Sequence, residues 1–150
     1  MRGRLLVAGA VAATALALGL GTGGTAVAAP AGVEGTPCSA AARACVDLGS
    51  YHAWLIKDGK VEHGPVGISQ GGEGRETPRG DFAVERKSAD HKSKEFNNAP
   101  MPWAVFFAPG GIAFHEGRKE TPSAGCVRLS AADAEIFFHA LQIGDRVEVR

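Results

Sequence analysis

Two side chains near the C-terminus have the chemistry of a catalytic pair. Cys126 and His115 lie eleven positions apart in the stretch FHEGRKETPSAGCVRL. A cysteine attacks as its thiolate, and with an ordinary pKa of about 8.5 it needs a cationic or dipolar neighbour to ionise near neutral pH. An imidazolium is such a neighbour, so we expect a thiolate–imidazolium pair if the two side chains meet. Spacing alone favours the alternative, a partly buried cysteine beside an unrelated surface histidine.

The residues next to Cys126 favour the reactive interpretation. Gly125 permits a tight turn and leaves space for a substrate, and the backbone amides of Gly125 and Cys126 are candidate donors to a developing oxyanion. Arg128 lies on the same side as Cys126 if the segment is extended, where its planar guanidinium would bind a substrate carboxylate. A salt bridge from Arg128 to Asp133 or Glu135 is the structural alternative.

Other chemical motifs are incomplete. The glycine-rich stretch GEGRETPRG lacks the Lys-Ser or Lys-Thr that follows the last glycine of a phosphate loop. The cysteines lack the Cys-x-x-Cys spacing of a zinc site or a thioredoxin-like redox centre. We therefore expect no metal and no organic cofactor. The remaining histidines are expected to be ordinary surface or half-buried residues: His52, His63, His91 and His139.

The N-terminus has the pattern of a secretory signal peptide. Arg2 and Arg4 precede an uncharged run from Leu5 to Leu20, and Ala26-Val27-Ala28 has small residues at −3 and −1 of a cleavage site. The sequence predicts a signal peptide over residues 1–28 and a secreted, cell-wall location. An uncleaved anchor is the alternative, although the run is short of the ~20 residues that a spanning helix needs. Without its two N-terminal arginines the chain is slightly acidic, which argues against nucleic acid as a partner.

The cysteine count is odd. In an oxidising compartment paired cysteines form disulfides, and an unpaired one needs an explanation. Cys38 and Cys45, near the mature N-terminus, form the economical pair and leave the Cys126 thiol free. The rival pairing joins Cys126 to one of the other two and makes its sulfur structural.

Residues 29–43 are rich in Pro, Gly, Ala and Thr and predict a flexible tether, followed by one compact domain over residues 44–150. Alternating apolar residues predict a mostly β domain. Its clearest hairpin joins Ala53–Lys57 to Lys60–His63 through Asp58-Gly59, the dipeptide that a two-residue type I′ turn prefers.

The remaining elements follow from the same patterns. Ser88 to Pro100 is charged and polar and predicts a long surface excursion. Ser130 is placed to cap one main helix near the C-terminus, with Ile136, Phe137, Ala140 and Leu141 on its buried face. Alternation or apolar runs predict the other strands: Cys45–Leu48, Asp81–Arg86, Trp103–Ala108, Ile112–Phe114 and Arg146–Arg150.

Together these motifs resemble the L,D-transpeptidase catalytic domain, also called the YkuD domain. The segment SAGCVRL follows FHEG, TPRGDF precedes both, and a helix and GDRVEV come after. The resemblance covers roughly Ala44 to Arg150 and implies a β-sandwich-like domain. It implies that Cys126 is the acyl-accepting nucleophile and His115 its base.

The other matching positions carry supporting roles in the resemblance. Ser123 and Gly125 occupy its small polar and glycine positions, and Arg128 flanks the substrate groove. Thr77, Pro78 and Gly80 match an upstream segment that is mainly structural.

The resemblance implies an exported, monomeric cysteine enzyme of cell-wall biogenesis that acts on peptidoglycan stem peptides. Transfer to an acceptor amine would form 3-3 cross-links, and transfer to water would make the enzyme an L,D-carboxypeptidase. Carbapenem-type β-lactams would inactivate it covalently. Two alternatives remain: a non-catalytic wall-binding module of the same fold with Cys126 in a disulfide, and a secreted redox or metal-binding protein.

Two features depart from the family pattern. Ala124 stands where many members have a second histidine, which leaves His115 as the one candidate base in the motif. The connection from His115 to Cys126 is also shorter than is common in the family. We expect these departures to affect substrate preference more than the chemistry.

Overall fold

The computed structural model describes residues 31–150, so the expected signal peptide over residues 1–28 lies outside the described residues. These residues form strands and one helix, in the order β1 (Ala44–Asp47), β2 (His52–Lys57), β3 (Lys60–Gly67), β4 (Gly80–Ala83), β5 (Arg86–Ser93), β6 (Ala99–Ala108), β7 (Ile112–Glu116), β8 (Val127–Leu129), α1 (Ala131–Ala140) and β9 (Arg146–Val149). The mostly β prediction with one helix near the C-terminus is confirmed.

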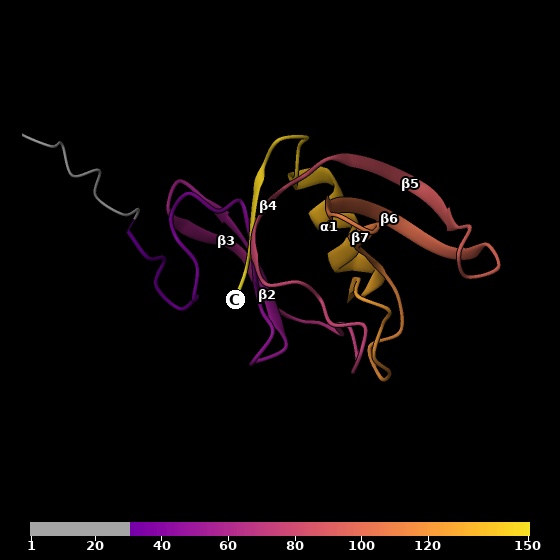
Figure 1. Ribbon diagram of the computed structural model, residues 1–150. Helices are drawn as coiled ribbons and strands as arrows, with labels where there is room; N and C mark the ends of the chain where they lie inside the picture. The colour runs from indigo at the N-terminus through magenta and orange to yellow at the C-terminus, as the bar shows by residue number, and fades with distance from the viewer. Residues whose placement is uncertain (1–30) are drawn as a thin grey trace, which may run out of the picture.

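The strands form two sheets (Figure 1). The five-stranded sheet has the order β3-β2-β1-β9-β4, and the four-stranded sheet has the order β5-β6-β7-β8. Neighbouring strands run antiparallel except for β1 with β9 and β7 with β8, which are parallel. One hydrophobic core draws residues from both sheets and from α1. The result is the sandwich-like arrangement that the sequence predicts.

The helix covers the core face of the four-stranded sheet. It contacts β6, β7 and β8 (Figure 1), and the ring of Phe137 packs 5.3 Å from that of Phe114. Ser130 caps the helix as predicted, because its hydroxyl accepts the Asp133 N–H. The buried face was expected to include Ile136, which is instead 41% exposed, and Ala134 is buried in its place. The buried face of the helix is therefore centred on Phe137, whose side chain faces the sheet.

Two predictions of secondary structure, one strand and one surface excursion, were wrong. Asp81–Arg86 is not one strand, because β4 pairs with β9 while β5 pairs with β6 in the other sheet. The chain changes sheets between Ala83 and Arg86. Ser88–Pro100 is not a surface excursion, since most of it forms a long, curved hairpin from β5 and β6 (Figure 1). Its polar composition reflects strands that are exposed on much of their surface. The hairpin across Asp58-Gly59 is confirmed, with positive φ at both residues.

The expected tether, residues 29–43, is described from residue 31 and packs against the five-stranded sheet instead of extending away from it. The Cys38–Cys45 disulfide is present, and Val33, Cys38 and Ala42 are buried with residues of β1 and β2. The composition of this segment predicted flexibility because it does not show the two anchors, the disulfide to Cys45 and the buried carboxylate of the distant Glu148.

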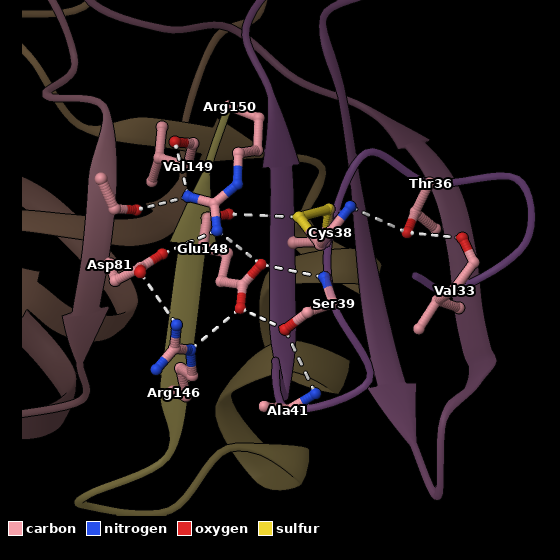
Figure 2. A network of polar contacts seen from close by, with 12 residues as sticks. Val33, Thr36, Cys38, Ser39, Ala41, Asp81, Arg146, Glu148, Val149 and Arg150 are labelled. Atoms are coloured by element: carbon pink, nitrogen blue, oxygen red, sulfur yellow. Dashed lines mark hydrogen bonds and ion pairs between the residues drawn. A yellow bond between two sulfur atoms is a disulfide. The ribbon is translucent and has the colours of Figure 1, made fainter. Parts of the chain in front are cut away.

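That carboxylate belongs to Glu148, whose side chain is 1% exposed (Figure 2). It accepts hydrogen bonds from the backbone and hydroxyl of Ser39 and from the guanidinium groups of Arg146 and Arg150. Asp81 on β4 pairs with the same two arginines. Burial opposes ionisation of Glu148, but these bonds outweigh it and lower its pKa. The network joins the N-terminal segment, β9 and β4.

No helix among residues 31–150 is long and apolar enough to cross a membrane.

Glu148→Gln is expected to lower the free energy of unfolding by about 1.5–3 kcal/mol at pH 7, the range for hydrogen bonds to a charged group. Because the folded pKa lies below the ordinary 4.5, this stabilisation is present above pH 4.5 and is lost as pH falls through the folded pKa. Urea unfolding at several pH values measures it, with exposed Glu73→Gln as the control. A stability difference that persists unchanged at pH 2 would contradict it.

Candidate active site

The parallel pairing of β7 and β8 decides which side chains share a face. His115 pairs with Arg128 and Phe114 with Val127. Cys126 directly precedes β8 and, one step back along this register, lies opposite Ala113. Paired residues point to the same side of a sheet and successive residues alternate. His115, Arg128, Ala113 and Cys126 therefore share one face, while Phe114 and Val127 point into the core.

This face forms the floor of an open cavity of about 1280 Å³. Cys126 packs against an apolar cluster of Met101, Ala104, Phe106 and Ala113. Both Cys126 and His115 line the cavity, as does Arg128. The walls come from the β5–β6 hairpin on one side and from the His115-to-Cys126 connection on the other. The structure thus brings the two sequence-predicted catalytic residues into one cavity.

The backbone determines the protonation state and orientation of His115. Its Nδ1 lies 2.7 Å from the carbonyl oxygen of Glu116, and a carbonyl only accepts, so Nδ1 carries the proton. Nε2 is then the basic nitrogen. The side chain is buried, at 7% exposure. Burial lowers its pKa, the hydrogen bond to the Glu116 carbonyl acts in the opposite direction, and the charge of Arg128 lowers the pKa further. His115 is accordingly neutral at pH 7 and ready to accept a proton through Nε2.

Cys126 is a free thiol. Its Sγ lies 3.6 Å from the carbonyl oxygen of Gly111. Burial raises its pKa, although the Ala113 N–H and the charge of Arg128 act in the opposite direction. With a raised thiol pKa and a lowered imidazole pKa, the resting pair is neutral. Burial thus favours the uncharged forms of both groups over the expected thiolate–imidazolium pair.

Ser123 and Gly125 shape the turn before Cys126. The Ser123 hydroxyl donates to the carbonyl oxygen of Cys126 at 2.5 Å and accepts the Gly125 N–H at 3.1 Å. Gly125 has φ +116°, and a Cβ there would lie 2.5 Å from the side chain of Ile112, so only glycine fits. Because Ser123 engages the Gly125 amide, the Cys126 amide is the remaining oxyanion donor of the two that the sequence suggested.

Thr77 ties a second loop to the nucleophile turn. It is 3% exposed, and its hydroxyl donates to the Gly125 carbonyl at 2.7 Å and accepts the Gly71 N–H at 3.0 Å. The same loop pairs with the turn through its backbone, because Gly72 donates to Ser123 and Ser123 donates to Gln70. The glycine-rich stretch that lacks the features of a phosphate loop thus supports the turn before Cys126 through hydrogen bonds.

Arg128 makes no salt bridge to Asp133 or Glu135, which pair with His63 and His139 instead. Its Nη1 donates to carbonyl oxygens of the His115-to-Cys126 connection, at residues 118, 121 and 122, over 3.3–3.4 Å. Gly117 allows this close passage, since a Cβ there would lie 2.8 Å from the Arg128 side chain. Arg128 therefore holds the connection over the sheet and adds a positive charge to the cavity.

The model of the L,D-transpeptidase catalytic domain (YkuD) matches residues 41–149. The chain belongs to this family. No curated protein matches the sequence.

Solved L,D-transpeptidase structures share the fold of this chain. The Xylanimonas cellulosilytica L,D-transpeptidase is 30% identical over 77% of this chain and 63% of its own, with a TM-score of 0.65. That from Stackebrandtia nassauensis is 28% identical over 71% of this chain and 54% of its own, with a TM-score of 0.66. An L,D-transpeptidase in complex with imipenem, 22% identical over 71% and 57%, has a TM-score of 0.64. The chain thus spans about half to three fifths of the length of these structures.

In this L,D-transpeptidase domain a second imidazole reaches the cavity from an unexpected strand. Ala124 provides none, but His91 on β5 lines the cavity and its ring packs 4.9 Å from that of Phe106. Arg86, also on β5, places its guanidinium 3.3 Å above the same ring. Neither residue was expected at the cavity, because the sequence placed His91 in a surface excursion and Arg86 at the end of a strand over Asp81–Arg86. The sequence around His91 is polar throughout and gave little indication of a strand.

Thr77→Val is expected to cost about 1–3 kcal/mol, because it leaves the buried Gly125 carbonyl and Gly71 N–H without their hydroxyl partner. Turnover should fall as well, since the turn that carries Cys126 loses its brace. Thermal or urea unfolding and steady-state rates measure the two effects. Thr77→Ser keeps the hydroxyl and is the matched control. A Val variant with unchanged stability and rate would show that the bond is dispensable.

The thiol of Cys126 should react slowly at neutral pH in the absence of substrate. Because burial raises its pKa above the ordinary range of about 8.5–9.0, the alkylation rate with iodoacetamide is expected to reach half its maximum above pH 9.0. Mass spectrometry at a series of pH values measures the rate, with a free cysteine peptide as reference. A plateau reached below pH 8 would indicate a stable thiolate–imidazolium pair instead.

Proposed function

We propose that this chain is an exported cysteine acyltransferase that acts on peptidoglycan stem peptides as an L,D-transpeptidase. The observation that carries the proposal is a free thiol and a buried, neutral imidazole on one face of an open cavity, in a chain of the YkuD family. Export is supported by the Cys38–Cys45 disulfide, because such bonds persist in oxidising compartments, and by the pattern of residues 1–28. We also propose that it acts as a monomer, because Cys126, His115 and the rest of the cavity lining come from one chain.

In the first step of the proposed reaction, His115 Nε2 removes the proton from the Cys126 thiol as Sγ attacks. The target is the carbonyl carbon of the L-centre in a donor tetrapeptide, at its bond to the terminal D-residue. The negative charge on the carbonyl oxygen is stabilised by the Cys126 amide. His115 then protonates the leaving amine, the carbon–nitrogen bond breaks, and a thioester to Cys126 remains.

In the second step an amine from an acceptor stem attacks the thioester. His115 takes one proton from this amine, the carbon–sulfur bond breaks, and the thiolate of Cys126 recovers the proton from His115. The product is a 3-3 cross-link between two diamino acid residues. Water as the acceptor gives a trimmed stem, the L,D-carboxypeptidase reaction. A neutral resting pair suits both steps, because each begins with proton transfer to an uncharged imidazole.

The non-catalytic alternative required Cys126 in a disulfide. The pairing of Cys38 with Cys45 leaves Cys126 free, so that alternative loses its premise. The redox alternative needs a resolving cysteine near Cys126, and both other cysteines are already joined to each other.

A covalent adduct on Cys126 tests the proposal. Incubation with tetrapeptide stems is expected to yield an acyl-enzyme and either cross-linked or trimmed products, detected by mass spectrometry. Carbapenem-type β-lactams should acylate the same residue, and an L,D-transpeptidase of similar fold has been solved in complex with imipenem. Cys126→Ala should abolish both adducts. Adducts on another residue, or none on a folded wild-type protein, would refute the proposal.

His115→Ala is expected to slow acylation by about 10²–10⁴-fold, the usual contribution of a general base. His115 is buried, so circular dichroism must show that the variant is folded. His52→Ala, which removes a histidine outside the cavity, is the matched control. A rate within threefold of wild type would mean that another group takes the thiol proton.

A further inference from the structure

We propose that Arg86 forms a carboxylate-binding subsite at the far end of the groove, which selects donor stems with a free carboxylate over amidated stems. This inference rests on the proposed function and adds to it a substrate preference. Arg86 is the first residue of β5, whereas the sequence predicted it as the last residue of a strand over Asp81–Arg86.

One row of residues crosses the sheet from Arg86 to Cys126. Arg86 pairs with Phe106 on β6, and Phe106 pairs with Ala113 on β7. One step back along the β7–β8 register, the neighbour of Ala113 is Cys126. All four residues share the face that forms the cavity floor, because paired positions point to the same side. The groove therefore has the nucleophile at one end of the row and a guanidinium at the other.

The row sets the distance between the two groups. Adjacent strands lie about 4.8 Å apart, so the strands that carry Arg86 and Cys126 are separated by about 14 Å. The Arg86 side chain leans inward, with its guanidinium carbon 3.3 Å from the centre of the Phe106 ring on the next strand. The charge is thus about two strand spacings, roughly 10 Å, from the nucleophile.

The Arg86 guanidinium is held in place but makes no ion pair among residues 31–150. Stacking on Phe106 orients its plane, and the ring of His91 covers the edge of Phe106 at an interplanar angle of 79°. No carboxylate of the described residues lies within salt-bridge distance of Arg86. Lys94 and Glu95 also line the cavity, but they follow the opposite end of β5 from Arg86. An oriented, unpaired guanidinium at the end of an apolar floor is suited to a ligand carboxylate.

A donor stem has carboxylates at the required reach. With the acyl carbon at Cys126, the carboxylate of the leaving D-residue is one residue away, at about 3.5 Å, and is too close to reach Arg86. Two others lie roughly 7–10 Å from the acyl carbon: the α-carboxylate of the preceding γ-linked glutamyl residue, and the carboxylate on the side chain of the diamino acid. Both present the same chemistry, and selective amidation distinguishes them.

The test compares three synthetic tetrapeptide donors: one with both carboxylates free, one amidated at the γ-linked residue, and one amidated on the diamino acid side chain. The wild-type kcat/KM is expected to be about tenfold higher for the free donor than for one of the amidated donors, as for one charge-assisted bond. That donor identifies the bound carboxylate. Arg86→Gln should lower the rate of the free donor about tenfold and remove the preference.

Two further variants test whether the preference depends on the planar guanidinium of Arg86 and on its position in the cavity. Arg86→Lys keeps the charge but loses the planar fork, and is expected to retain part of the preference. Arg79→Gln removes an exposed arginine outside the cavity and should leave all three rates unchanged. Equal wild-type rates for the three donors would overturn the proposal. So would an Arg86→Gln variant that is folded but slows every donor alike.

A binding measurement separates this inference from the proposed function. In the Cys126→Ala background, calorimetry is expected to show tighter binding of the free donor than of one amidated donor, and loss of the difference in Arg86→Gln/Cys126→Ala. This result without turnover by wild type would refute the transpeptidase reaction and retain the subsite. Equal binding of the three donors would overturn the subsite, whatever the wild-type activity.

Discussion

The parallel pairing of β7 with β8 is the constraint on which the site depends. Parallel strands cannot be joined by a tight hairpin, so the chain after His115 must return to the start of its own strand before it adds the next one. The return passes over one face of the sheet and delivers Cys126 to the entrance of β8, on the same face as His115. Proximity of the two groups is thus a consequence of strand direction.

The two faces of the four-stranded sheet have different environments: one packs in the core and the other lines the cavity. Phe114 and Val127 turn toward the shared core with α1, while their neighbours His115 and Cys126 turn toward the cavity. The cavity face is still partly apolar, because Phe106, Ala104 and Ala113 form its floor. This low-polarity setting explains why burial raises the pKa of the thiol and lowers that of the imidazole, and why both groups rest uncharged.

Neither of the two proposed catalytic residues is positioned by its own strand alone. The Glu116 carbonyl selects the tautomer of His115, and Ser123 and Thr77 hold the turn before Cys126 through buried hydroxyl groups. Thr77 belongs to the long connection that follows β3, so the nucleophile is braced by a loop between strands of the other sheet. That sheet is in turn joined to the N-terminal segment through the buried carboxylate of Glu148.

The sequence by itself determined the identity of the chemical groups, the mostly β class and the helix cap at Ser130, because these depend on residue type and short-range pattern. The Gly before Cys126 and the Asp58-Gly59 turn are likewise local requirements of backbone conformation. Tertiary structure decided what depends on pairing between distant segments. Strand direction, the switch of sheets after Ala83 and the arrival of Arg86 and His91 at the cavity all follow from strand order, which local alternation does not encode. The protonation states of His115 and Cys126 depend on tertiary structure for the same reason, since burial is a property of the whole fold.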